Sequence, residues 1–499
     1  MVFLHDRLRN KSLKERLITP SEAAEYIKNG MTVAASGFTP SGYPKAIPLA
    51  LAERVAREGN IHINLLTGAS VGNELDGVLA EKGIISRRYP YHTNKILRDR
   101  INQGAVSYKD IHLGHFPQQI RYGFFGKIDL ALIEAAAITE EGGIIPTTSV
   151  GASPTFVSEA EKILIELNTS QPLELEGIHD IYYLEDPPAR KPIPLISPYE
   201  RIGSTYIPIE TEKILGIVVT DIKDGVRSLP PGDDSSDRIA AHLIEFLYHE
   251  VKKDRLPHNL LPIQSGVGST ANAVLRGLLE SPFENMDFYS EVIQDSVLDL
   301  LDSRKLNGAS GTSLTFSEAG LKRFYKNIEE YKHKIILRPQ EISNHAEIIR
   351  RLGSIAINTA VEVDIYGHIN STNIFGSDII NGIGGSGDFT RNAYLSIFTT
   401  PSTLKNGSIS CIVPMVSHVD HTEHDVHIVV TEQGLADIRG LSPRERAGVI
   451  IENCAHPDYK PILRDYYRRS LRKGGHMPHD LQDAFSLHNR FIEIGSMRD

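Results

Sequence analysis

Apolar and polar residues along this chain alternate between two periods, one typical of buried strands and one typical of amphipathic helices. Residues 31–37 (MTVAASG) and 62–70 (HINLLTGAS) are short apolar runs, and residues 43–59 between them have the apolar spacing of a helix. The runs at 128–135 (IDLALIEA) and 161–168 (EKILIELN) are apolar almost throughout, as in parallel strands that are covered on both faces. This succession of strands and helices predicts an α/β fold.

The same pattern returns in the second half of the chain. Prolines interrupt it at residues 187–204 (PPARKPIPLISPYERIGS), and a strand-like run, ILGIVVTD, follows. Residues 259–281 then read as strand, glycine turn and helix, and the part after Leu441 is rich in helix formers that we expect to cap this half. A length of 499 residues also fits two or three domains. We therefore predict two tandem α/β domains, residues 1–210 and 211–499, with the boundary near Thr211.

The composition indicates a globular protein and argues against nucleic-acid-binding, disulfide-rich and membrane proteins. The chain has 40% hydrophobic and 23% charged residues, as in globular proteins, and its formal charge of −10 argues against a broad nucleic-acid surface. Two cysteines, Cys411 and Cys454, are too few for a disulfide framework and favour a reducing cytoplasm. Neither a signal peptide nor an apolar run of the ~20 residues that span a bilayer is apparent, so we expect no membrane partner.

Three glycine-rich turns, near Gly37, Gly266 and Gly384, each follow a strand-like run. Glycine lets the backbone take positive φ and lets a ligand approach the amide N–H groups. In QSGVGSTANAV the turn leads directly into a helix, so Val267 and Gly268 could donate to an oxyanion or a phosphate. A plain tight turn is the alternative for each of them.

The third turn, NGIGGSGDF, formally matches the dinucleotide fingerprint through Gly382, Gly384 and Gly387. That fingerprint needs an acidic residue about 20 positions on, and none occurs from Thr390 to Val419. We therefore reject a dinucleotide site, since Asp388 follows the glycines too closely. The turn is better explained as a backbone surface that lies under a substrate.

Other candidate chemistry is weaker. His418, His421, His424 and His427 recur at a spacing of three, which places them on different faces of a strand or helix, so we expect hydrogen-bonded histidines rather than a metal site. The serine-hydrolase motif G-x-S-x-G is absent. Cys454 has His456 nearby, but a buried structural cysteine is the better interpretation.

Glu291, in YSEVIQDSVLDLLDS, stands just ahead of an apolar helical run. Taken alone, this carboxylate could be a solvated surface charge, a group at a helix N-terminus, or a nucleophile at the rim of a cleft. The last alternative arises because the strand-like MDFY precedes it, and ligands of open α/β folds bind beyond the carboxyl ends of strands.

Motifs along nearly the whole chain resemble those of the acetyl-CoA hydrolase/transferase family of CoA-transferases. They include SGFTPSGYPKAIP, INQGAVSYKDIHL, PIQSGVG, YSEVIQDS, RPQEISN, NGIGGSGDF, SHVDHTEHDV and TEQGLADIRGLSPRERA. Within this family, YSEVIQDS and NGIGGSGDFTRNAYLSIF look most like the branch of succinyl-CoA:acetate and propionyl-CoA:succinate CoA-transferases.

The resemblance implies two tandem CoA-transferase-type α/β domains, an active site in the cleft between them, and a homodimer. It implies that Glu291 is the nucleophile, that the amides of Val267 and Gly385 form the oxyanion hole, and that Asn344 lies near the acyl and carboxylate groups. We expect the remaining substrate or CoA contacts at Gly266, Gly268, Gly384 and Asp388. Coenzyme A is then a substrate, and neither a cofactor nor a metal is expected.

The implied activity is transfer of CoA between short-chain carboxylic acids, with succinyl-CoA and acetate or propionate as expected substrates. Glu291 would pass through an acyl-glutamyl anhydride and a glutamyl-CoA thioester, which predicts ping-pong kinetics. An acyl-CoA hydrolase is the alternative, because water could resolve the same thioester. A non-catalytic acyl-CoA-binding protein and a dehydrogenase are further alternatives; a glutamate nucleophile argues against the former and the missing acidic residue against the latter.

Overall fold

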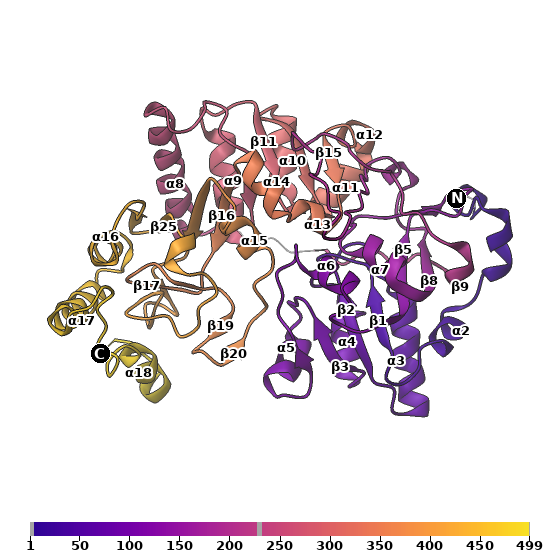
Figure 1. Cartoon of the computed structure of the whole chain (residues 1–499), viewed down its shortest axis with the longest axis horizontal. Coiled ribbons are helices and arrows are strands. Elements are labelled where there is room, and N and C mark those ends of the chain that lie inside the picture. The colour runs from indigo at the N-terminus through magenta and orange to yellow at the C-terminus, as the bar shows by residue number, and fades with distance from the viewer. Residues whose placement is uncertain (1–3, 227–231, 499) are drawn as a thin grey trace. The chain divides into compact units, whose positions relative to one another are not determined.

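The computed structural model describes residues 4–226 and 232–498. These residues form two compact units (Figure 1). Unit 1 contains residues 4–226 together with Phe288–Leu301 and Asn307–Leu352, and unit 2 contains the remaining described residues. The chain therefore returns to unit 1 after it has entered unit 2. The predicted domain boundary at Thr211 divides the sequence at one point, and it stays a prediction.

Unit 1 is built on a seven-stranded sheet in which every neighbouring pair is parallel. Its strand order is β4 (Ser107–Tyr108), β3 (Ile85–Tyr89), β2 (Ile63–Thr67), β1 (Thr32–Ala35), β5 (Ile128–Ala135), β8 (Ala160–Asn168) and β9 (Ile214–Thr220). The four apolar runs of the first half are thus strands, as predicted. The run ILGIVVTD, which we placed in the second domain, is β9 and pairs with β8.

The sheet of unit 1 is covered on both faces, which explains its apolar sequences. Seven of the eight residues of β5 are buried. Helix α3 (Ala46–Glu58), the predicted helix between the first two strands, contributes Ile47 and Leu51 to a core that also contains Val33 and Leu132 (Figure 1). The parallel strands and their helices therefore form one buried core in this unit.

Unit 2 contains a second set of parallel strands. Strands β10 (Ile263–Ser265), β16 (Ile355–Thr359), β21 (Leu395–Thr399) and β25 (Ile428–Thr431) pair in that order, and β26 (Gly434–Asp437) adds an antiparallel edge to β25. Helix α8 (Asp234–Lys252) packs against α9 (Ser269–Glu280). The predicted strand, glycine turn and helix at 259–281 are β10, its following turn and α9.

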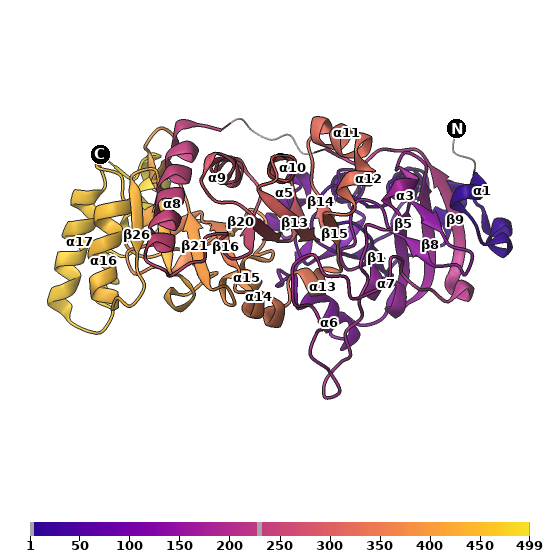
Figure 2. The same cartoon turned by 90° about the horizontal axis from the view of Figure 1, so that it is seen from above.

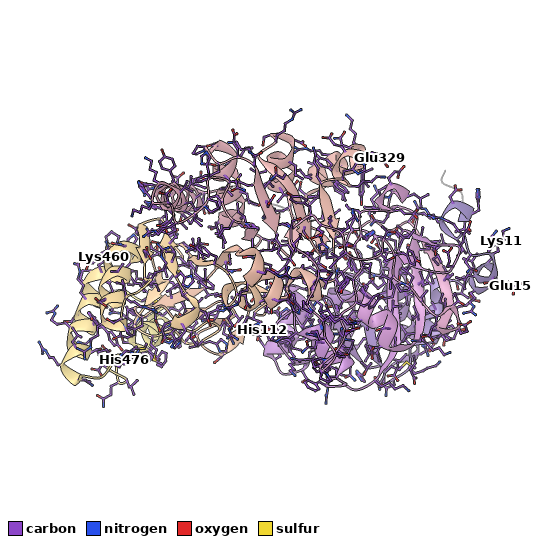
Figure 3. All side chains as sticks on the ribbon, turned by 45° about the horizontal axis from the view of Figure 1, so that its top comes forward. Lys11, Glu15, His112, Glu329, Lys460 and His476 are labelled. Carbon is purple, nitrogen blue, oxygen red and sulfur yellow. The ribbon has the colours of Figure 1, made fainter. Side chains whose placement is uncertain are left out.

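The C-terminal part of unit 2 is helical, as predicted from its sequence. Helix α16 (Pro443–Cys454) contacts β26 and is followed by α17 (Lys460–Lys473) and α18 (Ser486–Ile494); Figure 2 shows α16 and α17 side by side. In Figure 3, Lys460 marks the first residue of α17, and His476 lies three residues beyond its last, Lys473. Across the described residues, no helix has both the length and the apolar character needed to cross a bilayer.

Candidate active site

Glu291 lies in unit 1, in the bend between β11 (Met286–Tyr289) and β12 (Val292–Ile293). Its carbonyl oxygen accepts hydrogen bonds from the N–H groups of Thr312, at 2.7 Å, and Ser313, at 3.2 Å. A Cβ at Gly311 would come within 3.1 Å of the same oxygen, so the close approach of the two segments favours glycine there. Helix α10 begins only at Asp295, so the helix N-terminal interpretation of Glu291 is wrong.

The segment after Glu291 pairs with a strand that is hydrogen-bonded to the first glycine-rich turn of the chain. Strand β12 pairs with β14 (Ser313–Leu314), and the Oγ of Ser313 donates to the carbonyl oxygen of Phe38 at 2.7 Å. The Oγ of Ser41 donates to the carbonyl oxygen of Leu314 at 2.6 Å. The turn near Gly37 therefore supports the backbone on which Glu291 stands.

Asn344 contacts the side chain of Glu291 directly. Its Nδ2 donates to Oε1 of Glu291 at 2.9 Å, and the Asn344 side chain is buried whereas Glu291 is half-buried. The Oγ of Ser343 donates to Oδ1 of Asn344 at 2.8 Å, which leaves the amide nitrogen facing the carboxylate. A charge-assisted bond of this kind fixes the orientation of a carboxylate.

The residues that hold Asn344 come from β11 and from α13 (Gln340–Ser343), the short helix that precedes it. The hydroxyl of Tyr289 donates to the carbonyl oxygen of Ile342 at 2.6 Å, and burial raises the pKa of this phenol. Burial lowers the pKa of His345, next in sequence, to about 4, so its imidazole is neutral at pH 7. The predicted nucleophile and the predicted Asn344 thus meet in a polar, tightly connected part of unit 1.

The glycine turn after β10 belongs to unit 2. Gly268 has φ of 127° and ends the turn, and α9 starts at Ser269 without a side-chain cap. A Cβ at Gly266 or Gly268 would meet none of the described residues within 4 Å apart from its chain neighbours, so packing against them does not explain these glycines. The amides of a turn that precedes a helix without a side-chain cap can hold a group of negative charge, and this role of Val267 stays a prediction.

The turn that contains Gly384 and Gly385 also lies in unit 2 and opens the five-residue helix α15 (Ser386–Thr390), in which Asp388 is buried. The preceding strand, β20 (Asp378–Ile379), belongs to an antiparallel two-stranded ribbon. A dinucleotide fingerprint needs a parallel strand and a full helix, so the local structure agrees with its rejection.

The two glycine turns of unit 2 are connected through β16. The side chain of Gln264, in β10, donates to Oδ1 of Asn358 at 3.4 Å, and Asn358 donates to Oγ1 of Thr390, the last residue of α15, at 3.3 Å. These bonds connect β10, which precedes the turn of Val267, with the end of α15, which follows the turn of Gly385. Whether this network and the Glu291–Asn344 pair form one site stays a prediction, since they belong to different units.

The four spaced histidines have separate partners. His418 pairs with Asp420, His421 contacts Ser386, His424 contacts Thr422, and Nδ1 of His427 accepts the N–H of Ser396. Within the described ranges, no group of three or more His, Cys, Asp or Glu side chains could hold a metal ion. These histidines bond to carboxylates, hydroxyls and backbone, much as the sequence led us to expect.

Cys454 is buried, and burial raises the pKa of its thiol to about 12. Such a thiol is protonated at neutral pH and is a poor nucleophile. The interpretation of Cys454 as a structural cysteine is confirmed.

Sequence reasoning missed several residues that build the site. Three of them, Tyr289, Gln340 and Ser343, lie inside the motifs YSEVIQDS and RPQEISN. Their closeness in sequence to Glu291 and Asn344 could have indicated that they belong to the site. Arg121 and its partner Glu341, whose contacts are described below, are 220 positions apart, and no local pattern connects them.

Comparison with protein-family models places both halves of the chain in one family. Residues 1–219 match the acetyl-CoA hydrolase/transferase N-terminal domain, and residues 320–467 match the C-terminal domain. The chain belongs to the acetyl-CoA hydrolase/transferase family. The family predicted from the motifs and the α/β fold with its two family domains are thereby confirmed, whereas the cleft between the domains stays a prediction.

Named relatives in this family carry two kinds of activity. The chain is 56% identical over 494 residues to a succinyl-CoA:acetate CoA-transferase of Clostridium kluyveri, with 99% of this chain and 92% of the relative covered. It is 47% identical over 487 residues to a propanoyl-CoA:succinate CoA transferase of Escherichia coli, covering 96% and 98%. An acetyl-CoA hydrolase of Schizosaccharomyces pombe is 49% identical over 514 residues, covering 99% and 98%. The prediction of an enzyme of this family is therefore confirmed.

Among solved structures, the fold resembles a 4-hydroxybutyrate CoA-transferase from Porphyromonas gingivalis. The TM-score is 0.64 at 22% sequence identity, and the match covers 91% of this chain and 98% of the other. At this identity the likeness concerns the fold alone.

Proposed function

We propose that this protein is a CoA-transferase that moves CoA between short-chain carboxylic acids, with succinyl-CoA as donor and acetate or propionate as acceptor. The observation that carries the proposal is the 2.9 Å hydrogen bond from Asn344 to Glu291, which orients a carboxylate in the predicted catalytic motif. The names of the relatives with 56% and 47% identity support the choice of substrates.

The reaction starts with attack of one Glu291 carboxylate oxygen on the thioester carbonyl of the acyl-CoA. The C–S bond breaks, CoA leaves as a thiolate, and an acyl-glutamyl anhydride forms. The thiolate then attacks the glutamyl carbonyl, which releases the first acid and leaves a glutamyl-CoA thioester. The acceptor acid repeats these two steps in reverse order and regenerates the Glu291 carboxylate.

Asn344 holds one carboxylate oxygen and so sets the direction of the other. Attack requires a reacting oxygen within about 3–3.5 Å of the carbonyl carbon and correctly aligned with it, and a rotating carboxylate meets this condition rarely. The hydrogen bond therefore orients the Glu291 carboxylate, and Asn344 itself takes no part in bond formation or cleavage.

Each step develops negative charge on a carbonyl oxygen, which backbone N–H groups can stabilise. We propose Val267 and Gly385 for this role, because both stand in glycine turns of unit 2 that lead directly into a helix. The half-buried turn at Gly266 and Gly268 would accept part of the CoA, and Asp388 would stand close to it. Loss of one such donor costs about 100-fold or more in turnover.

Hydrolysis is the second candidate, because a relative with 49% identity is named acetyl-CoA hydrolase. Transfer and hydrolysis differ only in whether a carboxylate or water resolves the glutamyl thioester. Initial rates with succinyl-CoA and varied acetate separate them, since a transferase forms acetyl-CoA with parallel double-reciprocal lines, whereas a hydrolase releases free CoA at a rate that acetate does not change.

A matched pair of variants tests the role of Glu291 in the same assay. Glu291→Gln should abolish acetyl-CoA formation, whereas Glu329→Gln, at an exposed position of helix α12 (Ile328–Tyr331) in unit 1, should keep the wild-type rate (Figure 3). Acetyl-CoA formation by Glu291→Gln at the wild-type rate would refute the proposal.

A further inference from the structure

The position of Asn344 depends on α13, a helix of only four residues, Gln340–Ser343. A helix this short has almost no stability of its own, so its place must be set by contacts with other elements. Two of these contacts are hydrogen bonds from neighbouring segments: Nε2 of Gln340 donates to the carbonyl oxygen of Leu113 at 2.9 Å, and Tyr289 donates to Ile342.

A further contact of α13 is an ion pair between Glu341 and Arg121. Arg121, the last residue of α6 (Phe116–Arg121), donates from Nη1 to Oε2 of Glu341 and from Nη2 to Oε1, both at 2.7 Å. The side chains are 14% and 7% exposed, respectively. A bidentate pair with so little exposure is geometrically specific and is weakly screened by salt.

Arg121 is itself held in place. Its Nε and Nη2 also donate to the carboxylate of Asp186, at 3.0–3.2 Å, so the guanidinium group bridges two acids. Both acids raise the pKa of Arg121 and outweigh the lowering caused by burial. The cation therefore connects α6, the segment around Asp186 and α13.

Without Arg121, the one cation that the described residues place beside the Glu341 carboxylate is Arg190, whose guanidinium nitrogen is 3.9 Å away. A nearly buried carboxylate that loses its hydrogen bonds moves toward water, because leaving it unpaired is costly. The neighbouring turn of α13 would move with it, and Asn344 with that turn. A displacement of about 1 Å in a positioning group can cost ~100-fold in rate.

We infer that Arg121 is a positioning residue for Glu291 and acts through Glu341, α13 and Asn344. The inference rests on the proposed function, since it assigns Arg121 to the same site. Neither Arg121 nor Glu341 needs to touch the substrate in this role.

A double-mutant cycle tests this inference with wild type, Arg121→Met, Asn344→Ala and the double variant. The measured quantity is the single-turnover rate at which succinyl-CoA forms the Glu291 adduct, followed by intact-protein mass. We expect Arg121→Met to slow this rate about 10-fold or more with little change in the affinity for CoA. We expect the double variant to be no slower than Asn344→Ala alone, because residues that act through one another are not additive.

The matched control is Arg464→Met. Arg464 makes a bidentate pair with Glu452 that joins α17 to α16 in unit 2, so the variant removes the same kind of interaction elsewhere. Its adduct rate should equal that of wild type. If Arg121→Met does not fold, the same cycle with Arg121→Lys decides, because lysine keeps the charge and loses the bidentate geometry.

Two results would overturn the inference. An Arg121 variant that forms the adduct at the wild-type rate would show that Asn344 does not depend on it. Equal slowing by the Arg121 substitution in the presence and absence of Asn344 would show that it acts by another route. Failure of wild type to form any adduct would instead contradict the proposed function, so the two failures are distinguishable.

Discussion

Replacing Asn344 by alanine removes the amide that orients Glu291 and leaves the reacting atoms in place. A hydrogen bond to a charged group contributes about 1.5–3 kcal/mol, and 1.36 kcal/mol corresponds to a tenfold change in rate. If the whole of this contribution is needed in the transition state, Asn344→Ala forms the glutamyl-CoA adduct about 10- to 160-fold more slowly than wild type. Rapid quenching after mixing with succinyl-CoA, followed by intact-protein mass, measures this rate.

The control for this prediction is Asn94→Ala in the same unit. Asn94 caps helix α5 (Lys95–Asn102) by accepting from the N–H groups of Ile96 and Leu97, and loss of such a cap costs about 1 kcal/mol of stability. This variant should form the adduct at the wild-type rate despite its lower stability. Equal rates for Asn344→Ala and wild type would refute the argument that the hydrogen bond orients the nucleophile.

Two further predictions concern stability. Lys45 is fully buried between the carboxylates of Glu134 and Asp224, so Lys45→Met leaves two buried acids without their cation. The free energy of unfolding, measured by urea titration, should fall by about 3–5 kcal/mol. A loss below about 1 kcal/mol would contradict this prediction. Burial lowers the pKa of His368, but Asp364 and a second carboxylate outweigh this effect, so the pKa is raised in the folded protein. The stability that protonated His368 contributes is therefore complete below its unfolded pKa of about 6.5, and it is lost as the pH rises through the folded pKa. His368→Asn should therefore destabilise the protein more at pH 5.5 than at pH 9, and an equal effect at both would contradict the pairing.

Much of the fold could be predicted because its signals are local. The run IDLALIEA is apolar throughout because β5 is covered on both faces, and the turn QSGVG followed by a helical pattern is the transition from β10 to α9. The ILGIVVTD run was also recognised as a strand, but its neighbour was not, since nothing in the sequence of β9 specifies pairing with β8.

The candidate site was predicted in part for the same reason. Glu291 and Asn344 lie in compact motifs, and their 2.9 Å contact joins positions 53 apart. The sequence left open whether Glu291 caps a helix, because the start of α10 at Asp295 depends on the preceding pairing of β12 with β14. Arg121 could not be found from the sequence, because an arginine at the end of an amphipathic helix is ordinarily a solvated charge.

The central claim, that Glu291 is the nucleophile, is tested most directly by intact-protein mass after mixing with succinyl-CoA in the absence of an acceptor acid. Peptide mapping then locates the modified residue. The account predicts a gain equal to CoA less water, located on Glu291 and absent from Glu291→Gln. An adduct on another residue, or steady release of free CoA without any adduct, would contradict it.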